Sequence, residues 1–171
     1  MYSSFKVFVL VGSPRKGNTW RLVELFLSEL SKFVRIEYDI KRVDDFNIEF
    51  CNGCQKCIFE SPDCIIKDDL VKVKELIGKS NLFILASPVY LHNVTAQLKK
   101  FIDRTCSWIH RPPFIGKFAI VTSTTAGSGL IEVLKMLRAV VTFWGMVCLA
   151  EIGAIMPAGR FIDEGKSYTE C

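Results

Sequence analysis

Four cysteines, Cys51, Cys54, Cys57 and Cys64, lie in one short stretch that reads C-N-G-C-Q-K-C-I-F-E-S-P-D-C. Two-residue gaps allow successive thiolates to converge on one centre from a single tight loop, as in the ferredoxin run C-x2-C-x2-C-x3-C. The last gap in this chain is longer than in that run. The residue type and the spacing together favour an iron–sulfur cluster of the 4Fe-4S kind, with these four cysteines as its ligands.

Zinc, disulfides and uncoordinated thiols are the alternatives for the same stretch. Zinc also accepts four thiolates, but usually from two C-x2-C pairs brought together from a distance, which a C-x2-C-x2-C triplet does not resemble. Disulfides need an oxidising compartment, and Cys106, Cys148 and Cys171 bring the total to seven, an odd number for pairing. Zinc and plain thiols stay open beside the cluster.

Length and charge limit the class of protein. The chain has 171 residues, of which 50% are hydrophobic, so we expect a single domain, residues 1–171, that carries the cysteine-rich loop 51–64 as an insert. The net charge is +4, and both signs are scattered without the basic stripe that a nucleic-acid backbone requires. Nucleic acid is therefore not an expected partner.

The first residues and the apolar runs bear on location. The opening M-Y-S-S-F-K-V-F-V-L-V has a lysine within a short apolar run, and G-S-P-R-K follows where a signal peptide would have its cleavage site. No run approaches the length of a membrane span. We therefore expect a cytoplasmic protein that does not bind a membrane, in which thiols stay reduced and can hold a metal.

Apolar, β-branched runs alternate with segments of helical period. Strands are predicted over Phe5–Val11, Val34–Ile40, Leu82–Ala86, Phe118–Thr122 and Met146–Ile155. Helices are predicted over Asn18–Phe33, Asp68–Ile77, Val94–Thr105 and Leu130–Trp144, with Asn18, Asp68 and Asp69 at helix starts and Gly78 and Gly145 at helix ends. This alternation is that of βαβ units, and nearly unbroken apolar strands are typical of a parallel sheet covered on both faces.

Few residues follow the last predicted strand. Residues 156–171 include Pro157, Gly159 and Gly165, so we expect a shortened C-terminus in which the helix after a fifth strand is missing or stunted. The bare face of the sheet would then need another cover. A partner subunit is the simplest one, so we expect a homodimer or homotetramer.

The segment G-S-P-R-K-G-N-T, residues 12–19, joins the first strand to the first helix, which is where an open α/β sheet binds phosphates. It matches neither the dinucleotide motif G-x-G-x-x-G nor the P-loop, so a single phosphate monoester suits it better, with a plain capped turn as the alternative. The small residue and the donors that would surround the anion are Ser13, Arg15, Gly17, Asn18 and Thr19.

Two further loops follow predicted strands at the same carboxyl edge. They read S-P-V-Y-L-H-N, residues 87–93, and T-S-T-T-A-G-S-G, residues 122–129. We expect a flat ring system with one polar edge to lie between them. Pro88, Val89 and Tyr90 would pack on the ring, and backbone groups from Thr124 to Gly127 would reach its polar edge.

The motifs in this order resemble one known family. G-S-P-R-x-G-N-T, C-x-G-C-x-x-C-x6-C-x3-D-D, S-P-V-Y followed by A-Q-L-K-x-F-I-D-R, and T-x-x-x-A-G are similar to those of the NADPH-dependent FMN reductase family, and within it to the iron–sulfur flavoproteins. The resemblance covers about residues 5–155. It implies a flavodoxin-like three-layer α/β sandwich with a five-stranded parallel sheet in the order 2-1-3-4-5, and FMN at the switch point.

The resemblance also assigns roles to residues. The FMN phosphate would be held by Ser13, Arg15, Asn18 and Thr19, with Gly17 among them. The isoalloxazine would be bordered on one side by Pro88, Val89, Tyr90, His92 and Asn93. The opposite side would be formed by Thr124, Thr125, Ala126 and Gly127.

Neither histidine is an expected catalytic base. The chain has only two, His92 and His110, and no Ser-His-Asp or Cys-His arrangement is marked by the sequence. His92 is a candidate for contact with flavin or substrate, His110 is interpreted as structural, and no catalytic residue is assigned. Cys106, Cys148 and Cys171 are interpreted as buried or incidental.

Together these patterns predict an FMN-dependent oxidoreductase in which electrons pass from a donor through a 4Fe-4S cluster to FMN and on to a small acceptor. A ferredoxin-like protein is the expected donor, with NAD(P)H as the alternative, because of a basic surface made of Lys56, Lys99, Lys100, Arg104, Arg111 and Lys117. The alternative functions are a cluster-free NAD(P)H-dependent FMN or quinone reductase, a passive flavodoxin-type electron carrier, and a zinc-stabilised interaction module.

Overall fold

The computed structural model of the chain describes residues 4–157, which fold around one parallel sheet. Its strands β1 to β5 run over Phe5–Val11, Ile36–Arg42, Leu82–Pro88, Phe118–Thr125 and Val147–Ile155. The helices α1 to α6 span Asn18–Ser31, Lys56–Phe59, Leu70–Lys79, Ala96–Arg104, Cys106–His110 and Leu130–Phe143, and a 3-10 turn, η1, covers Val43–Asp45. The predicted alternation of strands and helices is confirmed.

The strand order across the sheet is β2-β1-β3-β4-β5, as the family resemblance implied. β1 pairs in parallel with β2 on one side and with β3 on the other, so it lies inside the sheet. The chain moves outward from β1 to β2 and then crosses back to β3, which reverses the direction of winding. Ligands of open α/β sheets bind at such a switch point, outside the carboxyl ends of the strands.

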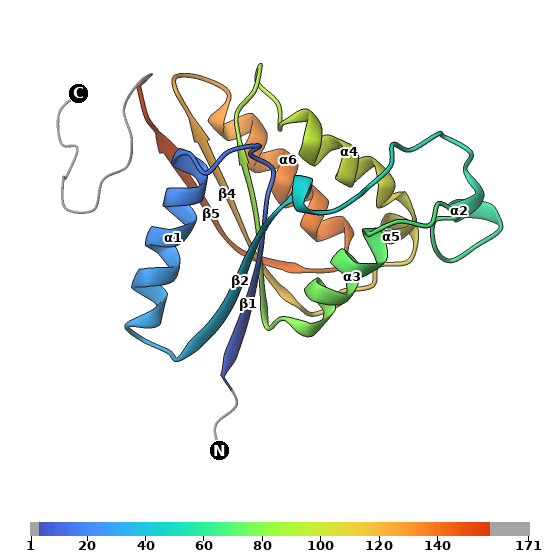
Figure 1. Cartoon of the computed structure of the whole chain (residues 1–171), viewed down its shortest axis with the longest axis horizontal. Helices are drawn as coiled ribbons and strands as arrows, with labels where there is room; N and C mark the ends of the chain where they lie inside the picture. Colours follow the sequence, from blue (N-terminus) through green and yellow to red (C-terminus); the bar gives the residue numbers. More distant parts are fainter. Residues whose placement is uncertain (1–3, 158–171) are drawn as a thin grey trace.

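Two apolar layers hold the helices to the two faces of the sheet (Figure 1). On one face, Val9 of β1 lies in a cluster with Val23 and Leu27 of α1. On the other face, Leu10 of β1 lies in a larger cluster with residues of α3, α4, α5 and α6, among them Leu98. Because neighbouring strand residues point to opposite faces and both faces are covered, the strands read as unbroken apolar runs.

Trp144 anchors the larger of the two layers. Its side chain is 1% exposed, and its ring centroid lies 5.1 Å from that of Trp108 and 5.7 Å from that of Phe101. The indole Nε1 donates a hydrogen bond to Oγ1 of Thr105 at 3.1 Å. These contacts join α4, α5 and the end of α6 into one block, and α2 packs against α5 at its edge.

Two helix boundaries differ from the predicted ones. The N-cap of α1 is Gly17 and not Asn18, and no side chain caps this end. Helix α3 begins at Leu70 and runs through Gly78 to Lys79, so Gly78 does not end it as predicted. At the start of α1 the N–H of Arg21 donates to the carbonyl oxygen of Gly17 at 3.1 Å, and at the end of α3 the N–H of Ser80 donates to that of Ile77 at 3.2 Å.

The predicted helix Val94–Thr105 is shorter in the structure. Oγ1 of Thr95 accepts a hydrogen bond from the N–H of Leu98 at 3.2 Å, which makes Thr95 the N-cap of α4. At the other end the chain leaves the helix at Thr105 and starts a second short helix at Cys106. The break sets α5 beside the cysteine-rich loop.

The end of the chain was predicted to be shortened, and most of that prediction concerns residues 158–171, which lie outside the described residues. The homo-oligomer derived from it therefore stays a prediction. Between residues 4 and 157, no helix combines the length and the apolar character that a membrane span requires. The cytoplasmic location also stays a prediction.

Two glycines give opposite expectations for substitution by alanine. A Cβ on Gly12, at the end of β1, would lie 2.7 Å from Cβ of Leu98 and 3.1 Å from Oγ1 of Thr95. We expect Gly12→Ala to lower the free energy of unfolding by about 1–3 kcal/mol through overpacking. A Cβ on Gly78 meets nothing within 4 Å, so Gly78→Ala should raise the same quantity by about 0.5–1 kcal/mol. Urea denaturation measures both, and equal stabilities would contradict the expectation.

Candidate functional site

A cleft of about 370 Å³ opens at the carboxyl edge of the sheet. Parallel pairing of β1 with β3 and of β3 with β4 places their ends, and the loops that follow them, side by side (Figure 1). The cleft is lined by Ser13, Arg15, Gly17, Asn18, Thr19, Pro88, Val89, Tyr90, Thr124, Thr125, Ala126, Met156 and Pro157. The structure thus brings together most of the residues that the sequence assigned to a flavin site.

The loop after β1 is wound into a turn by its own hydrogen bonds. Oγ of the buried Ser13 donates to the carbonyl oxygen of Arg15 at 2.7 Å and accepts from the N–H of Arg15 at 3.3 Å. The N–H of Gly17 donates to the same carbonyl oxygen at 3.0 Å. From β2, Nη1 of Arg42 donates to the carbonyl oxygen of Pro14 at 3.2 Å. The turn directs the start of α1 into the cleft.

The start of α1 is suited to an anion. The first N–H groups of a helix have no acceptor within the helix, and in α1 no side chain caps them. Its first turn contains no acidic residue, and the exposed Arg15 stands beside it on the cleft wall. N–H groups that no side chain of the helix start caps, the positive end of a helix dipole and a guanidinium form a donor set that fits a phosphate monoester.

Hydrogen bonds between elements close the base of the cleft. Oγ1 of Thr19 in α1 and Oγ1 of Thr124 in β4 are 2.6 Å apart, and both residues are buried. The N–H of Val89, after β3, donates to the carbonyl oxygen of Thr124 at 2.8 Å. Thr124 therefore joins the ends of α1, β3 and β4, and it fixes the distance between the cleft walls.

Met156 and Pro157 line the cleft but were not predicted to do so. They follow β5, and the N–H of Met156 donates to the carbonyl oxygen of Thr125 at 2.7 Å. The sequence could have predicted these two lining residues, because residues after the fifth strand of a parallel sheet reach the same edge as those after the first, third and fourth. The two residues add an apolar rim to the side of the cleft formed by β4.

His92, Asn93 and Gly127 lie beside the cleft and are not among the residues that line it. Backbone hydrogen bonds of 2.8 and 3.0 Å between Tyr90 and Asn93 close a tight turn, in which His92 has a φ of 60°. Nε2 of His92 is hydrogen-bonded to Oγ of Ser128 at 2.9 Å. His92 thus links the loop after β3 to the loop after β4.

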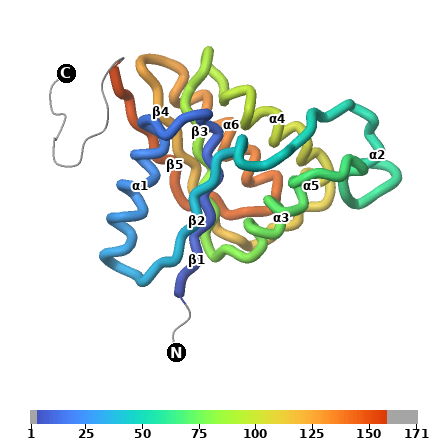
Figure 2. Tube along the Cα trace, viewed as in Figure 1, coloured from blue at the N-terminus to red at the C-terminus, as the bar shows by residue number. Residues whose placement is uncertain are grey.

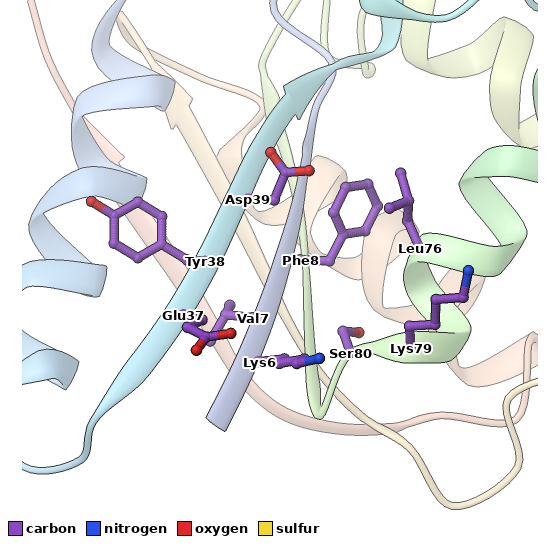
Figure 3. A pocket seen from close by; sticks show the side chains of 9 residues that line it. All are labelled: Lys6, Val7, Phe8, Glu37, Tyr38, Asp39, Leu76, Lys79 and Ser80. Atoms are coloured by element: carbon purple, nitrogen blue, oxygen red, sulfur yellow. The ribbon is translucent and has the colours of Figure 1, made fainter. Parts of the chain in front are cut away.

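A second hollow of about 300 Å³ lies between α3 and the strands β1 and β2 (Figure 3). Phe8 and Leu76 face each other across it, and the charged side chains of Glu37, Asp39 and Lys79 stand around it. It persists because the chain after β2 continues into η1 and the cysteine-rich loop instead of a helix over β1 and β2. It lies away from the carboxyl edge at which parallel sheets bind ligands, and we assign it no function.

The four clustered cysteines lie on a loop that leaves the body of the domain and returns through a closed stem (Figure 2). The N–H of Asn47 donates to Oδ2 of Asp69 at 2.9 Å, and the N–H of Asp69 donates to the carbonyl oxygen of Asn47 at 3.0 Å. One step further along, the N–H of Glu49 donates to Oδ2 of Asp68 at 2.9 Å. We call residues 51–64, beyond this stem, the thiol loop.

The thiol of Cys57 is influenced by the other cysteines of the thiol loop. Burial raises the pKa of the Cys57 thiol, and the charges of Cys106, Cys64, Cys51 and Cys54 raise it further. The other three thiols of the loop and Cys106 therefore act electrostatically on the Cys57 thiol. All are free thiols. Cys106, interpreted from the sequence as incidental, is one of the groups whose charge raises the pKa of Cys57.

The thiols fit a metal cluster in residue type and spacing along the chain, but they do not converge on one point in the structure. Within residues 4–157, no three side chains of His, Cys, Asp or Glu are close enough together to hold a metal ion. Gly53 has a φ of 67° and meets nothing within 4 Å of a Cβ, and Cys51 and Cys54 are exposed. The tip of the loop therefore has the room and the backbone freedom to tighten around a metal.

Two of the arginines expected on a docking surface hold the thiol loop instead. Arg104 is 1% exposed and pairs with Asp68, so its assignment to a basic surface is wrong. Arg111 is exposed, but its Nη1 donates to the carbonyl oxygens of Cys57 and Ser61, each at 3.1 Å. Arg104 lies on the buried face of α4, so its side chain points into the protein, where Asp68 of the loop stem is its counter-ion.

The remaining basic residues of that predicted surface also have local partners. Lys56 lies 3.8 Å from Glu60, and Lys99 lies 2.5 Å from Asp103. Lys117 donates to the carbonyl oxygen of Ser80 at 2.8 Å, and Nζ of Lys100 lies over the ring of Phe50, 5.4 Å from its centroid. The net positive field near the loop is therefore weaker than the sequence predicted.

A protein-family model described as NADPH-dependent FMN reductase matches residues 5–159. This range contains every segment that lines the cleft, together with the whole thiol loop. The chain belongs to the NADPH-dependent FMN reductase family. The resemblance inferred from the ordered motifs is confirmed, including its iron–sulfur flavoprotein branch.

Curated relatives include several proteins named iron–sulfur flavoprotein. One from Archaeoglobus fulgidus is 38% identical over 144 residues, which are 83% of this chain and 64% of the relative. One from Clostridioides difficile is 31% identical over 150 residues, again 83% and 64%. An NAD(P)H-dependent FAD/FMN reductase from Geobacillus thermodenitrificans is 31% identical over 100 residues, 57% of this chain and 50% of the relative. The chain thus spans about half to two thirds of the length of these relatives.

Solved structures share the fold. An NAD(P)H:quinone oxidoreductase from Methanothermobacter marburgensis has a TM-score of 0.73 at 20% identity, over 92% of this chain and 87% of that one. An apo NADH:FMN oxidoreductase has a TM-score of 0.64 at 20% identity, over 88% and 76%. The predicted flavodoxin-like architecture is confirmed.

The first prediction for the site concerns Arg15. A charge-assisted hydrogen bond to a phosphate is roughly twice as strong as a neutral one, so Arg15→Ala should weaken FMN binding by about ten- to a hundredfold. Isothermal titration calorimetry of the apoprotein with FMN measures the change. Arg138→Ala is the control, because Arg138 is exposed, pairs with Glu151 and does not line the cleft. Equal affinities for the two variants would place the phosphate elsewhere.

The second prediction concerns acid stability at the loop stem. Burial alone would raise the pKa of Asp68, but hydrogen bonds from Arg104 and from the N–H groups of Glu49 and Leu70 outweigh it and lower the pKa. A carboxyl whose pKa is lower in the folded than in the unfolded chain stabilises the fold above the unfolded value of about 3.9. That contribution is lost as the pH falls through the folded pKa.

We therefore expect Asp68→Asn to lower the free energy of unfolding by about 3–5 kcal/mol at pH 7, since Arg104 loses its counter-ion. The difference from the unsubstituted protein should shrink below about pH 4. Urea denaturation at a series of pH values measures both effects. A difference that is constant from pH 7 to pH 3 would contradict the assignment.

Proposed function

We propose that the chain is an FMN-dependent oxidoreductase. The observation that carries the proposal is the cleft at the switch point, in which the uncapped start of α1 and Arg15 suit a phosphate while Val89 and Tyr90 offer apolar surface to a ring. Membership of the FMN reductase family supports FMN as the bound group. When bound, FMN supplies the chemistry that exchanges one-electron and two-electron carriers.

In this proposal the protein's residues bind and orient the flavin and control access to it. The turn built on Ser13 presents backbone N–H groups to the phosphate, and the bond between Thr19 and Thr124 closes the base of the cleft. Tyr90 is 45% exposed at the opposite wall, which leaves an open approach for a small acceptor and for NAD(P)H. The family's NADPH dependence supports a nucleotide donor.

We further propose that the thiol loop holds a 4Fe-4S cluster on Cys51, Cys54, Cys57 and Cys64. Their free thiols, their spacing along one loop and the iron–sulfur flavoproteins among the relatives support this assignment. When bound, such a cluster supplies one-electron transfer. The loop contributes no residue to the cleft and projects from another side of the domain (Figure 1), so it offers a separate entry for electrons.

The identity of the electron donor distinguishes the cluster-bearing oxidoreductase from a cluster-free reductase. A cluster-bearing protein accepts single electrons from a ferredoxin-like protein through the thiol loop. A cluster-free reductase takes hydride from NAD(P)H at the cleft. A passive electron carrier of the flavodoxin type would show no catalytic turnover of a small acceptor with either donor.

Anaerobic purification, followed by an absorption spectrum, tests the function directly. Flavin bands together with iron and sulfide in amounts stoichiometric with the chain support the cluster-bearing oxidoreductase. Stopped-flow reduction by NADPH and by reduced ferredoxin, each followed by turnover of a quinone or peroxide, then identifies the donor. Absence of bound or bindable flavin would overturn the proposal, and stoichiometric zinc would overturn the cluster.

The four thiols should act as one metal site. Serine in place of any one of Cys51, Cys54, Cys57 or Cys64 is expected to lower iron content to less than half while FMN content stays unchanged, because the cleft contains none of them. The measurement is iron, sulfide and FMN per chain.

The control for these variants is Cys148→Ser. Cys148 lies in β5, and its Sγ–H donates to the carbonyl oxygen of Ala150. We expect this variant to keep both groups. Cys106 is a poor control, since its charge raises the pKa of Cys57. Iron that persists in all four loop variants would rule out the assigned ligands.

A further inference from the structure

The loop after β3 forms a tight turn at the wall of the cleft. Tyr90, which lines the cleft, exchanges two backbone hydrogen bonds with Asn93, at 2.8 and 3.0 Å. The two residues between them, Leu91 and His92, have φ of 48° and 60°, in the left-handed region that bulky L-residues rarely adopt. A strained turn persists only where the surrounding structure fixes it. The contacts that hold this turn therefore help to place Tyr90.

The closest of these contacts is made by Gly129, the N-cap of α6. It is buried and has a φ of 84°. A Cβ at this position would lie 2.7 Å from Cγ1 of Val89 and 2.9 Å from Cα of His92. The second of these atoms belongs to the backbone, so a side chain at residue 129 would push the turn away. The loop after β3 closes onto the loop after β4 because residue 129 is a glycine.

Hydrogen bonds join the two loops on both sides of this close contact. Nε2 of His92 and Oγ of Ser128 are hydrogen-bonded at 2.9 Å. Nearer the sheet, the N–H of Val89 donates to the carbonyl oxygen of Thr124 at 2.8 Å. Oγ1 of Thr125 donates to the carbonyl oxygen of Ser128 at 2.7 Å, which gives the loop after β4 a fixed shape of its own. Both loops carry residues that line the cleft, so these contacts set the spacing of its walls.

We propose that Gly129 and His92 are positioning residues for the flavin ring. Neither is among the residues that line the cleft, and both act through Val89 and Tyr90, whose place on the wall they fix. The inference rests on the proposed function, in which FMN occupies the cleft. A wall that is already in place spares a ligand the cost of ordering it. The ring of the flavin depends on these contacts, whereas its phosphate depends on the loop after β1.

The test compares FMN with riboflavin, which has the same ring and no phosphate, by calorimetric titration of the full-length apoprotein. Gly129→Ala should weaken the binding of both by a similar factor, about tenfold or more, because Val89 and the backbone of His92 must move. Gly116→Ala is the matched control. Gly116 has a φ of 79°, and a Cβ there meets nothing within 4 Å. This control carries the same backbone strain without the contact, so both affinities should stay unchanged.

A second pair of variants lies within the turn itself. Glycine adopts the left-handed region without strain, so His92→Gly and Leu91→Gly change the backbone in the same way. The side chain of Leu91 is 99% exposed, whereas that of His92 is bonded to Ser128. His92→Gly should therefore weaken the binding of both flavins by about two- to tenfold, and Leu91→Gly should not.

The partner hydroxyl provides a rescue. Ser128→Ala should reproduce the effect of His92→Gly, and the double variant should bind flavin no more weakly than either single one, because one hydrogen bond is lost in all three. Ser128→Thr keeps the hydroxyl and should retain the affinity. Urea denaturation of the apoproteins should give similar stabilities for His92→Gly and Leu91→Gly, which separates ring binding from a general loss of stability.

Equal flavin affinities for His92→Gly and Leu91→Gly would overturn the inference alone, and so would equal affinities for Gly129→Ala and Gly116→Ala. The pair within the turn decides if Gly129→Ala does not fold. A loss confined to FMN, or an unsubstituted protein that binds FMN but not riboflavin, would also overturn the inference alone, since the ring wall would then contribute nothing. An unsubstituted protein that binds neither flavin would overturn the proposed function and this inference together.

Discussion

Parallel pairing of β1, β3 and β4 is the constraint on which the rest of the structure depends. Val11 pairs with Ala86, and Pro88 pairs with Thr124, so the three chain segments that follow leave the sheet at one edge. The N–H of Gly12 donates to the carbonyl oxygen of Ala86 at 2.7 Å, which continues the ladder into the first loop. The cleft therefore needs no docking of separate domains. It is built where the sheet stops.

The thiol loop is organised on a different principle. Its residues are mostly exposed, and it is held by backbone hydrogen bonds at its stem and by arginines from α4 and from the end of α5. Elements with few buried apolar contacts open at lower free energy than a sheet core. The loop is thus able to rearrange its thiols without disturbing the cleft, whose geometry is fixed by the central strands.

Much of the fold was readable from the sequence because its signals are local. The apolar runs gave the strands, and the three loops with small and polar residues after them contain most of the cleft lining. The assignment of Arg104 to a basic surface was wrong, although the sequence contains a pattern that indicates its burial. Leu98, Phe101 and Arg104 are spaced three apart and share the buried face of α4. The helical spacing therefore indicates that Arg104 points into the protein. Its counter-ion could not be identified in the same way, because Asp68 is distant in the sequence and its pattern predicts a helix start.

Other differences depended on contacts that only the folded chain creates. Met156 and Pro157 join the cleft because β5 ends at the same edge as β4, which a local motif does not report. The start of α1 lacks a side-chain cap, although Asn18 is a residue type that favours capping. The convergence of the four thiols was inferred from spacing, whereas, among the described residues, the folded loop does not bring three of them within reach of one metal.

The closed stem has a consequence for how such an insert is gained or lost. Asn47 and Asp69, which stand at the two sides of the stem, are hydrogen-bonded to each other. A short turn in place of the whole loop would therefore close at little cost in chain entropy. The same deletion would remove Asp68 and the carbonyl groups of Glu49 and Ile66, and it would strand the guanidinium of Arg104 in an apolar setting. Divergence that discards the insert is therefore expected to replace the last residue of α4 with an uncharged side chain. The insert and the charged residue at the end of α4 are therefore expected to be kept or lost together, although they lie far apart in the sequence.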